Sequence, residues 1–436
     1  MRDKKLLILV VLTVMFGIAV IVWYFFRAQS ANNPTINTPS NPFGDIATNI
    51  PGREFITSLF NGGRDEDTEQ ERILPGERIL AQIWDKPVAG YAFISREVIL
   101  EATSTNATST SKKTTLIKKQ VDYLLFVDRL TGHVYGYEPK EGLLFQITNT
   151  TVPGIYDAYI VRNGTQVFMR RLDTDGETII TTVATIPPFI AGSEPKPLLS
   201  LGSLQRNVSS FAVSESSNTY SYLVANTTGS SVYTVNDKNK VSVTTSPFRE
   251  WSLTYGGEVP YMTTRPSAYI PGHTMTALTQ SYVFGDKTGL LSLPNSDNET
   301  FLASMWSSRG LTTFLVSKKD GTPRILDVDT LAPKCVWLDT FKALCGVPTE
   351  LPESEEGLPD DWFQGTVSFS DDFYLIIRKG AIGENDTTSL LYPLSEQSGK
   401  PFDVTKPSAN KSGSLVGFTN KQDGTLWLFN VALASQ

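Results

Sequence analysis

Two patterns of hydrophobic positions divide the chain into a short first part and a long second part. From Leu6 to Phe26 the sequence reads LLILVVLTVMFGIAVIVWYFF, which is apolar throughout and carries no charge. A helix of this length reaches about 30 Å, the thickness of a bilayer's hydrocarbon core. The pattern therefore predicts one transmembrane helix that contacts the lipid bilayer along its whole length.

From about Ile79 onward, short alternating runs of apolar and polar residues are separated by turn residues. Tyr156–Arg162 and Thr165–Arg170 are two such runs, and Asn163-Gly164 lies between them. An Asn-Gly pair between alternating runs is a strong hairpin signal, because both residues adopt positive φ readily. No long stretch of this part has a 3.6-residue period, so the pattern predicts an all-β fold.

The predicted hairpins recur at intervals of roughly 50 residues, a spacing typical of β-propeller blades with insertions. Candidate inner hairpins begin near Trp84, Asp157, Ser210, Trp251, Ala303, Val336 and Ser414. We therefore predict a β-propeller of about seven four-stranded blades, with six or eight blades and a pair of β-sandwiches as alternatives. Propellers commonly complete the last blade with a strand from the other terminus. Here Ile79–Trp84 is predicted to pair beside Trp427–Val431.

The sequence before the propeller suggests how the chain is placed at a membrane. Arg2, Lys4 and Lys5 precede the apolar run, and short flanks rich in Lys and Arg tend to stay cytoplasmic. We predict a cytoplasmic stub (1–5), the anchor (6–26), a flexible tether with a candidate short helix (27–78) and an extracytoplasmic propeller (79–436). A cleaved signal peptide is the alternative, although its apolar region would be shorter than this one.

Charge and rare residues narrow the classes of function. The formal net charge is −7, without the clustered Lys and Arg of a nucleic-acid-binding protein, so no nucleic-acid partner is expected. The chain has only two histidines, which excludes a multi-His metal centre. No metal and no cofactor are predicted.

The two cysteines, Cys335 and Cys345, flank a segment that reads as a hairpin turning through residues 339–341. In that register the two cysteines lie directly opposite each other, at a spacing that a disulfide can bridge. An extracytoplasmic location also favours a disulfide. Two buried free thiols are the alternative.

A long acidic loop, PESEEGLPDDWF, follows at residues 352–363. Long loops on a rigid scaffold often carry binding function, and Trp is a frequent interface anchor. Asp360, Asp361, Trp362 and Phe363 are therefore candidate interaction residues. The alternative is that Trp362 and Phe363 pack onto the blade and only hold the loop in place.

No catalytic residue is predicted. The G-x-S-x-G elbow of α/β-hydrolases does not occur, and His133 and His273 both follow turn glycines. Pairs of carboxylates such as Asp371-Asp372 could serve a glycosidase, but neighbours on a strand point to opposite faces.

Three stretches resemble a known group of proteins. They are GHVYGYEPKEGLLFQITNTTVPGIYDAYIVRNGTQVFMRRLD, KCVWLDTFKALCGVPTELPESEEGLPDDWFQGTVSFSDDF and the ending VGFTNKQDGTLWLFNVA. They are similar to uncharacterised, membrane-anchored, WD40-like β-propeller proteins of small-genome bacteria. The resemblance implies the architecture and the topology, and it transfers no activity and no functional residue.

Taken together, the sequence favours a membrane-anchored, extracytoplasmic docking module that binds another protein of the cell envelope. A propeller presents a rigid disc with many loops, which suits protein binding. The alternative is a propeller that binds or processes glycans. Catalysis is the less expected outcome.

Overall fold

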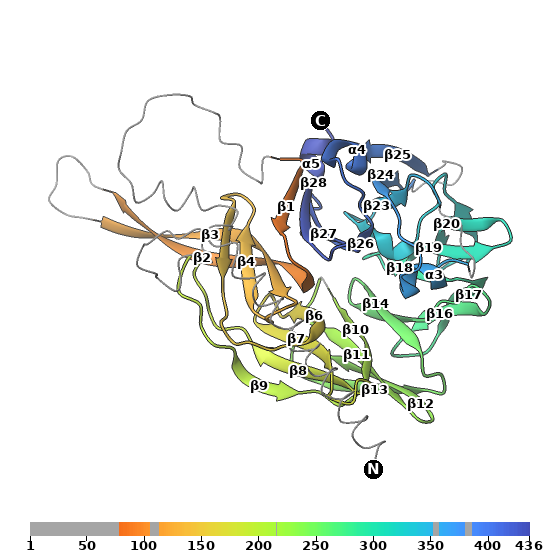
Figure 1. Cartoon of the computed structure of the whole chain (residues 1–436), viewed down its shortest axis with the longest axis horizontal. Coiled ribbons are helices and arrows are strands. Elements are labelled where there is room, and N and C mark those ends of the chain that lie inside the picture. Colours follow the sequence, from red (N-terminus) through yellow and green to blue (C-terminus); the bar gives the residue numbers. More distant parts are fainter. Residues whose placement is uncertain (1–77, 105–112, 215, 352–356, 380–385) are drawn as a thin grey trace, which may run out of the picture. The chain divides into compact units, whose positions relative to one another are not determined.

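The propeller is described by a computed structural model that covers residues 78–104, 113–214, 216–351, 357–379 and 386–436. Within these residues the chain forms seven antiparallel four-stranded sheets, the blades of a β-propeller (Figure 1). The prediction of an all-β propeller with about seven blades is confirmed. The stub, the anchor at Leu6–Phe26 and the tether lie outside the described residues. Among the described residues, no helix is long and apolar enough to span a membrane.

Blades 1 to 4 follow one another along the chain, each running from its inner to its outer strand. Blade 1 contains β2 (Val88–Ser104), β3 (Lys113–Asp128), β4 (Val134–Glu138) and β5 (Leu143–Gln146). Blade 2 contains β6 (Ile155–Val161), β7 (Gln166–Leu172), β8 (Ile179–Thr185) and β9 (Leu199–Ser203). Blade 3 contains β10 (Val208–Val213), β11 (Tyr220–Asn226), β12 (Gly229–Val235) and β13 (Val241–Ser246). Blade 4 contains β14 (Trp251–Gly256), β15 (Val259–Thr264), β16 (Pro271–Thr276) and β17 (Tyr282–Thr288).

Blades 5 to 7 complete the ring and carry the short helices of the described chain. Blade 5 contains β18 (Leu291–Pro294), β19 (Thr300–Ser307), β20 (Gly310–Ser317) and β21 (Pro323–Ile325). Blade 6 contains β22 (Cys335–Trp337), β23 (Lys342–Pro348), β24 (Asp371–Ile377) and β25 (Thr387–Tyr392). Blade 7 contains β26 (Val404–Ala409), β27 (Leu415–Asn420), β28 (Leu426–Asn430) and β1 (Leu80–Trp84). The helices are η2 (Ala332–Lys334), α3 (Asp360–Gln364), α4 (Leu394–Ser398) and α5 (Val431–Ala434).

The ring is closed by a strand from the N-terminal side of the propeller. β1 pairs antiparallel with β28, with Leu80 opposite Phe429 and Gln82 opposite Trp427. The inner strand β2 of blade 1 also contacts β26 of blade 7. The predicted pairing of the first strand with the last is therefore confirmed.

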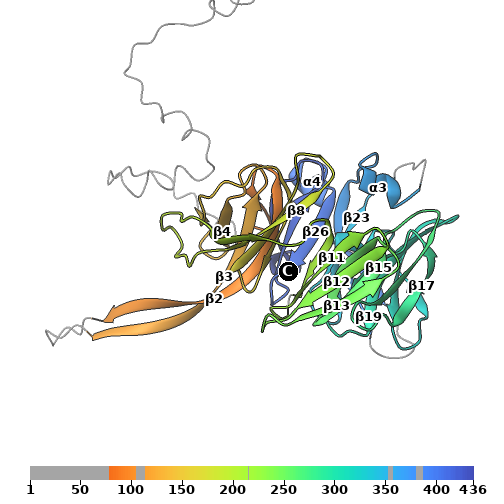
Figure 2. The same ribbon diagram turned by 90° about the horizontal axis from the view of Figure 1, so that it is seen from below.

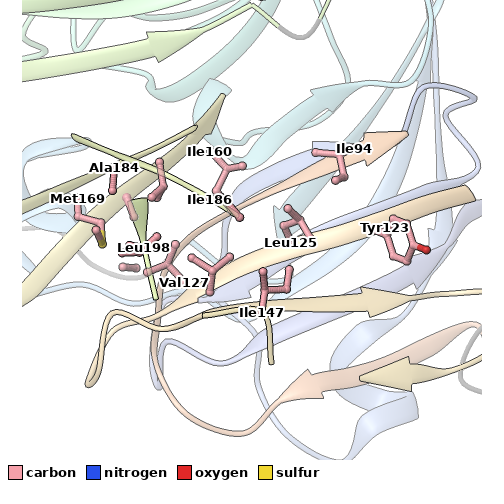
Figure 3. Close-up of a cluster of buried hydrophobic side chains, with 14 of the residues drawn as sticks. Ile94, Tyr123, Leu125, Val127, Ile147, Ile160, Met169, Ala184, Ile186 and Leu198 are labelled. Carbon is pink, nitrogen blue, oxygen red and sulfur yellow. The ribbon is translucent and has the colours of Figure 1, made fainter. Parts of the chain in front are cut away.

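Hydrophobic side chains fill the spaces between neighbouring blades. Figure 3 shows the cluster between blades 1 and 2, where Leu125 and Val127 of β3 face Ile160 of β6 and Met169 of β7. Full burial of such a side chain stabilises the fold by about 1.5–3 kcal/mol. Because both faces of a blade are covered in this way, no sheet has to stand alone in water.

Three of the predicted hairpin starts are wrong. Trp84 ends β1, Ala303 lies within the second strand β19, and Ser414 precedes the second strand β27. In blades 5 and 7 the true inner strands have weak sequence signals. β18 has only four residues and ends in Pro294, and β26 contains Lys406 and Pro407. The longer and more apolar second strands dominate the pattern in both places.

The hairpin of β2 and β3 is much longer than its blade. The two strands pair from Val88 opposite Asp128 to Ser104 opposite Lys113, whereas β4 pairs only with residues 124–127. Figure 2 shows the far end of this hairpin projecting from the propeller.

Candidate functional site

The connection between β23 and β24 (residues 349–370) carries all four of the predicted interaction residues. Its described part (349–351 and 357–370) contains the helix α3, which ends at Gly365 with a φ of 82°. Gly suits this left-handed helix end because it has no Cβ to clash. The Asp360 carboxylate accepts a hydrogen bond from the Ala268 backbone N–H at 2.5 Å. That bond fixes the insertion of blade 6 to the β15–β16 loop of blade 4.

The structure separates the four predicted residues. Trp362 and Asp361 are buried, and Asp360 is partly buried against blade 4. Phe363 points outward, with 53% of its surface exposed. The four residues therefore do not form one continuous surface, and only Phe363 offers a large apolar side chain to a partner.

Trp362 holds the insertion to the body of the propeller. Its ring stacks on Phe369 with centroids 6.4 Å apart, and its Nε1 donates to both carboxylate oxygens of Asp403 at 3.1 Å. Asp403 lies just before the inner strand of blade 7. The tryptophan thus joins the insertion of blade 6 to the start of blade 7.

Beneath Trp362 lies a fully buried ion cluster of Lys334, Asp371 and Asp403. The Lys334 Nζ is 2.7 Å from the Asp371 Oδ2 and 2.5 Å from the Asp403 Oδ1, and it also donates to the Val404 carbonyl at 3.1 Å. All three side chains have no exposed surface. Buried charges persist only when they are paired and hydrogen-bonded, because removing them from water costs several kcal/mol each.

The two carboxylates of this cluster have different surroundings. Asp403 accepts hydrogen bonds from Trp362, from the Ser368 hydroxyl and from the Phe369 backbone N–H. The Asp371 Oδ1 has no partner among the described residues. Burial raises the pKa of Asp371 to about 6, with a further contribution from the nearby Asp403 carboxylate, while Lys334 acts in the opposite direction.

Because the pKa of Asp371 is raised, the stability of the protein should depend on pH in a testable way. Because the pKa of Asp371 is higher in the folded than in the unfolded chain, its contribution to stability is complete below pH ~4 and is lost as the pH rises through about 6. We expect the wild-type free energy of unfolding to fall by ~3 kcal/mol more between pH 4 and 7 than that of Asp371→Asn. Urea denaturation of both proteins across this range is the measurement. Parallel curves for the two proteins would contradict it.

Four exposed apolar side chains lie in connections on the face of the ring that carries the insertion. Tyr269 and Ile270, which are 70% and 69% exposed, follow Ala268 in the β15–β16 loop that Asp360 holds. Phe248, in the β13–β14 connection, packs edge-to-face on Trp251 and is exposed on its other side. We call Phe248, Tyr269, Ile270 and Phe363 the loop-face patch. Exposed apolar side chains on one face of a protein are candidates for an interaction site.

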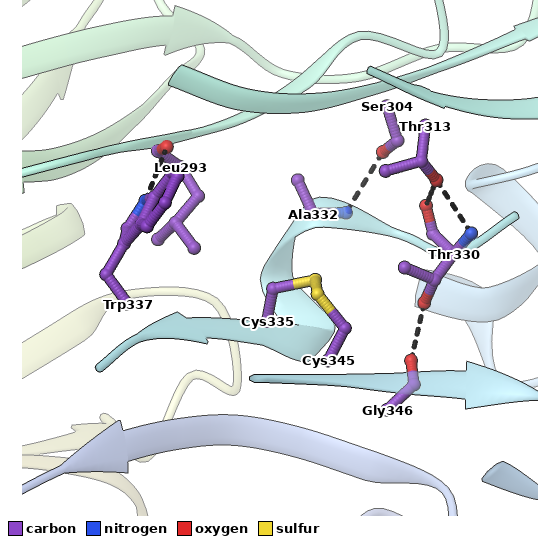
Figure 4. Close-up of a disulfide and its surroundings, with 9 residues drawn as sticks. All are labelled: Leu293, Ser304, Thr313, Thr330, Ala332, Cys335, Trp337, Cys345 and Gly346. Atoms are coloured by element: carbon purple, nitrogen blue, oxygen red, sulfur yellow. Dashed lines mark hydrogen bonds between the residues drawn. A yellow bond between two sulfur atoms is a disulfide. The ribbon is translucent and has the colours of Figure 1, made fainter. Parts of the chain in front are cut away.

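The two cysteines form a disulfide within blade 6 (Figure 4). Cys335 on β22 lies directly opposite Cys345 on β23, with their Cα atoms 4.0 Å apart. Next to the bond, the Thr330 hydroxyl donates to the Gly346 carbonyl, and the Ala332 N–H donates to Ser304 of blade 5. The disulfide thus lies where β22, only three residues long, joins its blade.

Replacing both cysteines with alanine should lower the free energy of unfolding by about 2–3 kcal/mol, because the bond closes a short loop in the unfolded chain. Urea denaturation with and without reductant measures the effect. The reductant should lower the midpoint of the wild type and leave the double variant unchanged. An unchanged wild-type midpoint, with both thiols shown to be free, would contradict the expectation.

Charged side chains near the central channel form ion pairs with each other. Arg170 donates to Asp157 at 2.9 Å, and Lys406 of blade 7 reaches the same carboxylate at 2.7 Å. The Tyr91 hydroxyl donates to the backbone carbonyls of Lys406 and Gly417. Among the residues that the structure describes, no group of three or more His, Cys, Asp or Glu side chains comes together as a metal site.

Sequence reasoning missed the buried cluster. Lys334 stands between Pro333 and Cys335, and a lysine is not a residue type that suggests burial. The sequence pattern marks Asp371 only as part of a carboxylate pair with Asp372, and it does not mark Asp403. The one local signal was the group of apolar residues, LAP and CVW, on either side of Lys334.

We compared the chain with known proteins, and the similar solved structures have low sequence identity to it. No protein-family model and no curated protein sequence matches the chain. Two of the similar solved structures are the hydrazine synthase of Kuenenia stuttgartiensis and the β-propeller domain of the trilobed protease from Pyrococcus furiosus, which has an open velcro topology. The first is 13% identical with a TM-score of 0.42, and covers 65% of this chain and 78% of its own. The second is 10% identical with a TM-score of 0.44, and covers 71% of this chain and 91% of its own.

Proposed function

We propose that this propeller docks a folded protein of the cell envelope through the loop-face patch, while the apolar segment Leu6–Phe26 keeps it in the membrane with the propeller outside. The observation that carries the docking proposal is the patch itself. Its aromatic and aliphatic side chains are exposed, and the Asp360–Ala268 hydrogen bond holds the loops beneath them.

The chemistry of the patch indicates the kind of partner. Phe363, Tyr269 and Ile270 would bury apolar surface against a complementary apolar pocket, and aromatic side chains often contribute most to such interfaces. Little ordering is needed on this side, since Trp362 and Asp360 already fix the loops. The partner is therefore expected to be a protein with an exposed apolar pocket.

Site-specific photocrosslinking in intact cells tests the proposal with a matched control. Phe363 and Phe341 are both in blade 6 and are 53% and 50% exposed. They lie at opposite ends of β23, and hence on opposite faces of the ring. A photoreactive phenylalanine at position 363 should give a discrete crosslinked product with another protein, and the same group at 341 should not. Equal products at both positions, or a product that contains only this chain, would overturn the proposal.

The variant Phe363→Ala separates binding from folding. We expect its free energy of unfolding to change by less than about 0.5 kcal/mol, because the side chain is exposed. The affinity for the partner identified by crosslinking should fall about tenfold or more, as for a residue at the centre of an interface. Calorimetry with the purified partner is the measurement, with Phe341→Ala as the control. An unchanged affinity in Phe363→Ala would count against the patch.

The membrane placement has its own test. Protease added to whole cells should cut the chain beyond residue 80, since the proposed topology puts the propeller outside. Protection of the propeller in intact cells, together with its digestion after lysis, would contradict the proposed orientation.

A further inference from the structure

The buried cluster has the composition and geometry of a site for amide-bond formation. Lys334 ends η2 before the inner strand of blade 6, Asp371 begins β24, and Asp403 precedes β26 of blade 7. The Lys334 Nζ lies 2.5 Å from the Asp403 Oδ1. The rings of Phe369 and Trp362 cover the amine, with centroids at 4.8 Å and 5.3 Å. An amine and a carboxyl group are thus held in contact without exposure to water.

The donors around Asp403 are arranged to stabilise negative charge on one oxygen. Its Oδ2 accepts from the Ser368 hydroxyl and the Phe369 N–H, each at 3.1 Å, and shares the Trp362 Nε1 donor with Oδ1. Fixed donors of this kind stabilise the oxyanion of a tetrahedral intermediate in acyl transfer. Its Oδ1, on the side of the amine, is the oxygen that can leave.

Asp371 is placed to move protons between the reacting groups. Its Oδ2 contacts the same Lys334 Nζ at 2.7 Å, while its Oδ1 is buried without a partner among the described residues. Burial raises the pKa of this carboxyl to about 6, so that it takes up a proton far more readily than an exposed aspartate. A buried carboxyl group that can be neutral is suited to general acid and base catalysis.

We propose that Lys334 and Asp403 become joined by an intramolecular isopeptide bond, formed with Asp371 as the proton carrier. The bond would connect blade 6 to blade 7 across 69 residues of sequence. It is independent of the docking function proposed above.

The reaction balances without any external reactant. The Lys334 ammonium gives one proton to Asp371, which passes it to Oδ1 of Asp403. This leaves a neutral amine, a neutral Asp403 acid and an ionised Asp371. The amine nitrogen attacks the Asp403 Cγ, and the negative charge develops on Oδ2. Asp371 takes the remaining excess proton from nitrogen and delivers it to Oδ1, which departs as water. A C–N bond forms, a C–O bond breaks, and nothing is oxidised or reduced.

The contact between the two groups should make the reaction much faster than it is between a free amine and a free acid in solution. Groups held in contact in a reactive orientation behave as if their concentration were very high, with effective molarities of roughly 10⁵–10⁸ M. The ion cluster seen in the structure is then the precursor of the covalent bond.

Mass spectrometry of the full-length protein purified from its membrane is the decisive experiment. After reduction of the disulfide, the peptides that contain Lys334 and Asp403 should be found as one branched peptide, lighter than their sum by one water. Trypsin should fail to cut after Lys334, because an acylated lysine is not a substrate. Separate, unmodified peptides with cleavage after Lys334 would overturn the proposal. A branch at Asp371 would overturn the assigned roles.

Variants provide a second measurement that does not depend on stability. Lys334→Arg, Asp403→Ala and Asp371→Asn should each lose the branched peptide. Lys421→Arg should keep it, because Lys421 lies near the same tryptophan, 4.9 Å from its ring, but is not part of the ion cluster of Lys334, Asp371 and Asp403. Persistence of the branched peptide in Asp371→Asn would overturn the role of Asp371 as proton carrier.

Discussion

Replacing Lys334 with methionine should lower the free energy of unfolding by about 3–5 kcal/mol, because it leaves two buried carboxylates without their cation. Methionine keeps a long, flexible side chain at this position. The loss of stability is therefore due mainly to removal of the charge and less to a change in side-chain volume. If the isopeptide bond has formed, the variant loses that bond as well. Urea denaturation at pH 7, followed by tryptophan fluorescence, measures the change.

The matched control for this experiment is Lys421→Met. Lys421 also lies over the Trp362 ring, and its ammonium is not one of the groups that form the ion pairs of the cluster. Its replacement should cost less than about 1 kcal/mol. Combining Lys334→Met with Asp403→Asn should cost less than the sum of the two single changes, since the second change removes a charge that the first leaves unpaired. A loss in Lys334→Met no larger than in Lys421→Met would contradict the expectation.

Removing the closing strand should have the largest effect of all. Deletion of residues 1–84 takes away β1, which buries Ala81 and Ile83 and pairs with β28. The loss of these buried side chains and of the ladder hydrogen bonds amounts to about 5 kcal/mol or more. We expect the protein to lose its cooperative thermal transition and its near-ultraviolet circular dichroism.

Deletion of residues 1–77 is the control for that truncation. It removes the segment before the propeller and keeps β1 intact. This shorter deletion should melt in a single cooperative transition. Identical transitions for the two truncations would show that β1 contributes nothing to the fold.

The sequence predicts the architecture well because the architecture rests on local signals. Asn163-Gly164 marks the turn between β6 and β7, and the apolar first and last strands indicate ring closure. The blade boundaries are harder to predict where inner strands are short or polar. The pattern does not identify β18 and β26 as inner strands, because the strands next to them have the stronger alternation of apolar and polar residues.

The candidate site could be predicted only in part. The acidic insertion stands out as a long loop, and Phe363 is exposed there. The burial of Trp362 depends on Asp403, which lies 41 residues further along the chain. Lys334 meets Asp403 only after blades 6 and 7 have packed together. Contacts over such separations leave no periodic trace in a single sequence.

The closing strand has a consequence for the order of folding during synthesis. β1 is made before every other strand of the ring, yet its partner β28 follows roughly 340 residues later. At about 5–20 residues per second, translation takes roughly 20–70 s to supply that partner. For this time the nascent chain holds an unpaired strand, Leu-Ala-Gln-Ile-Trp, with apolar side chains that need protection. A chaperone that binds extended apolar segments would act on this protein at its very first strand.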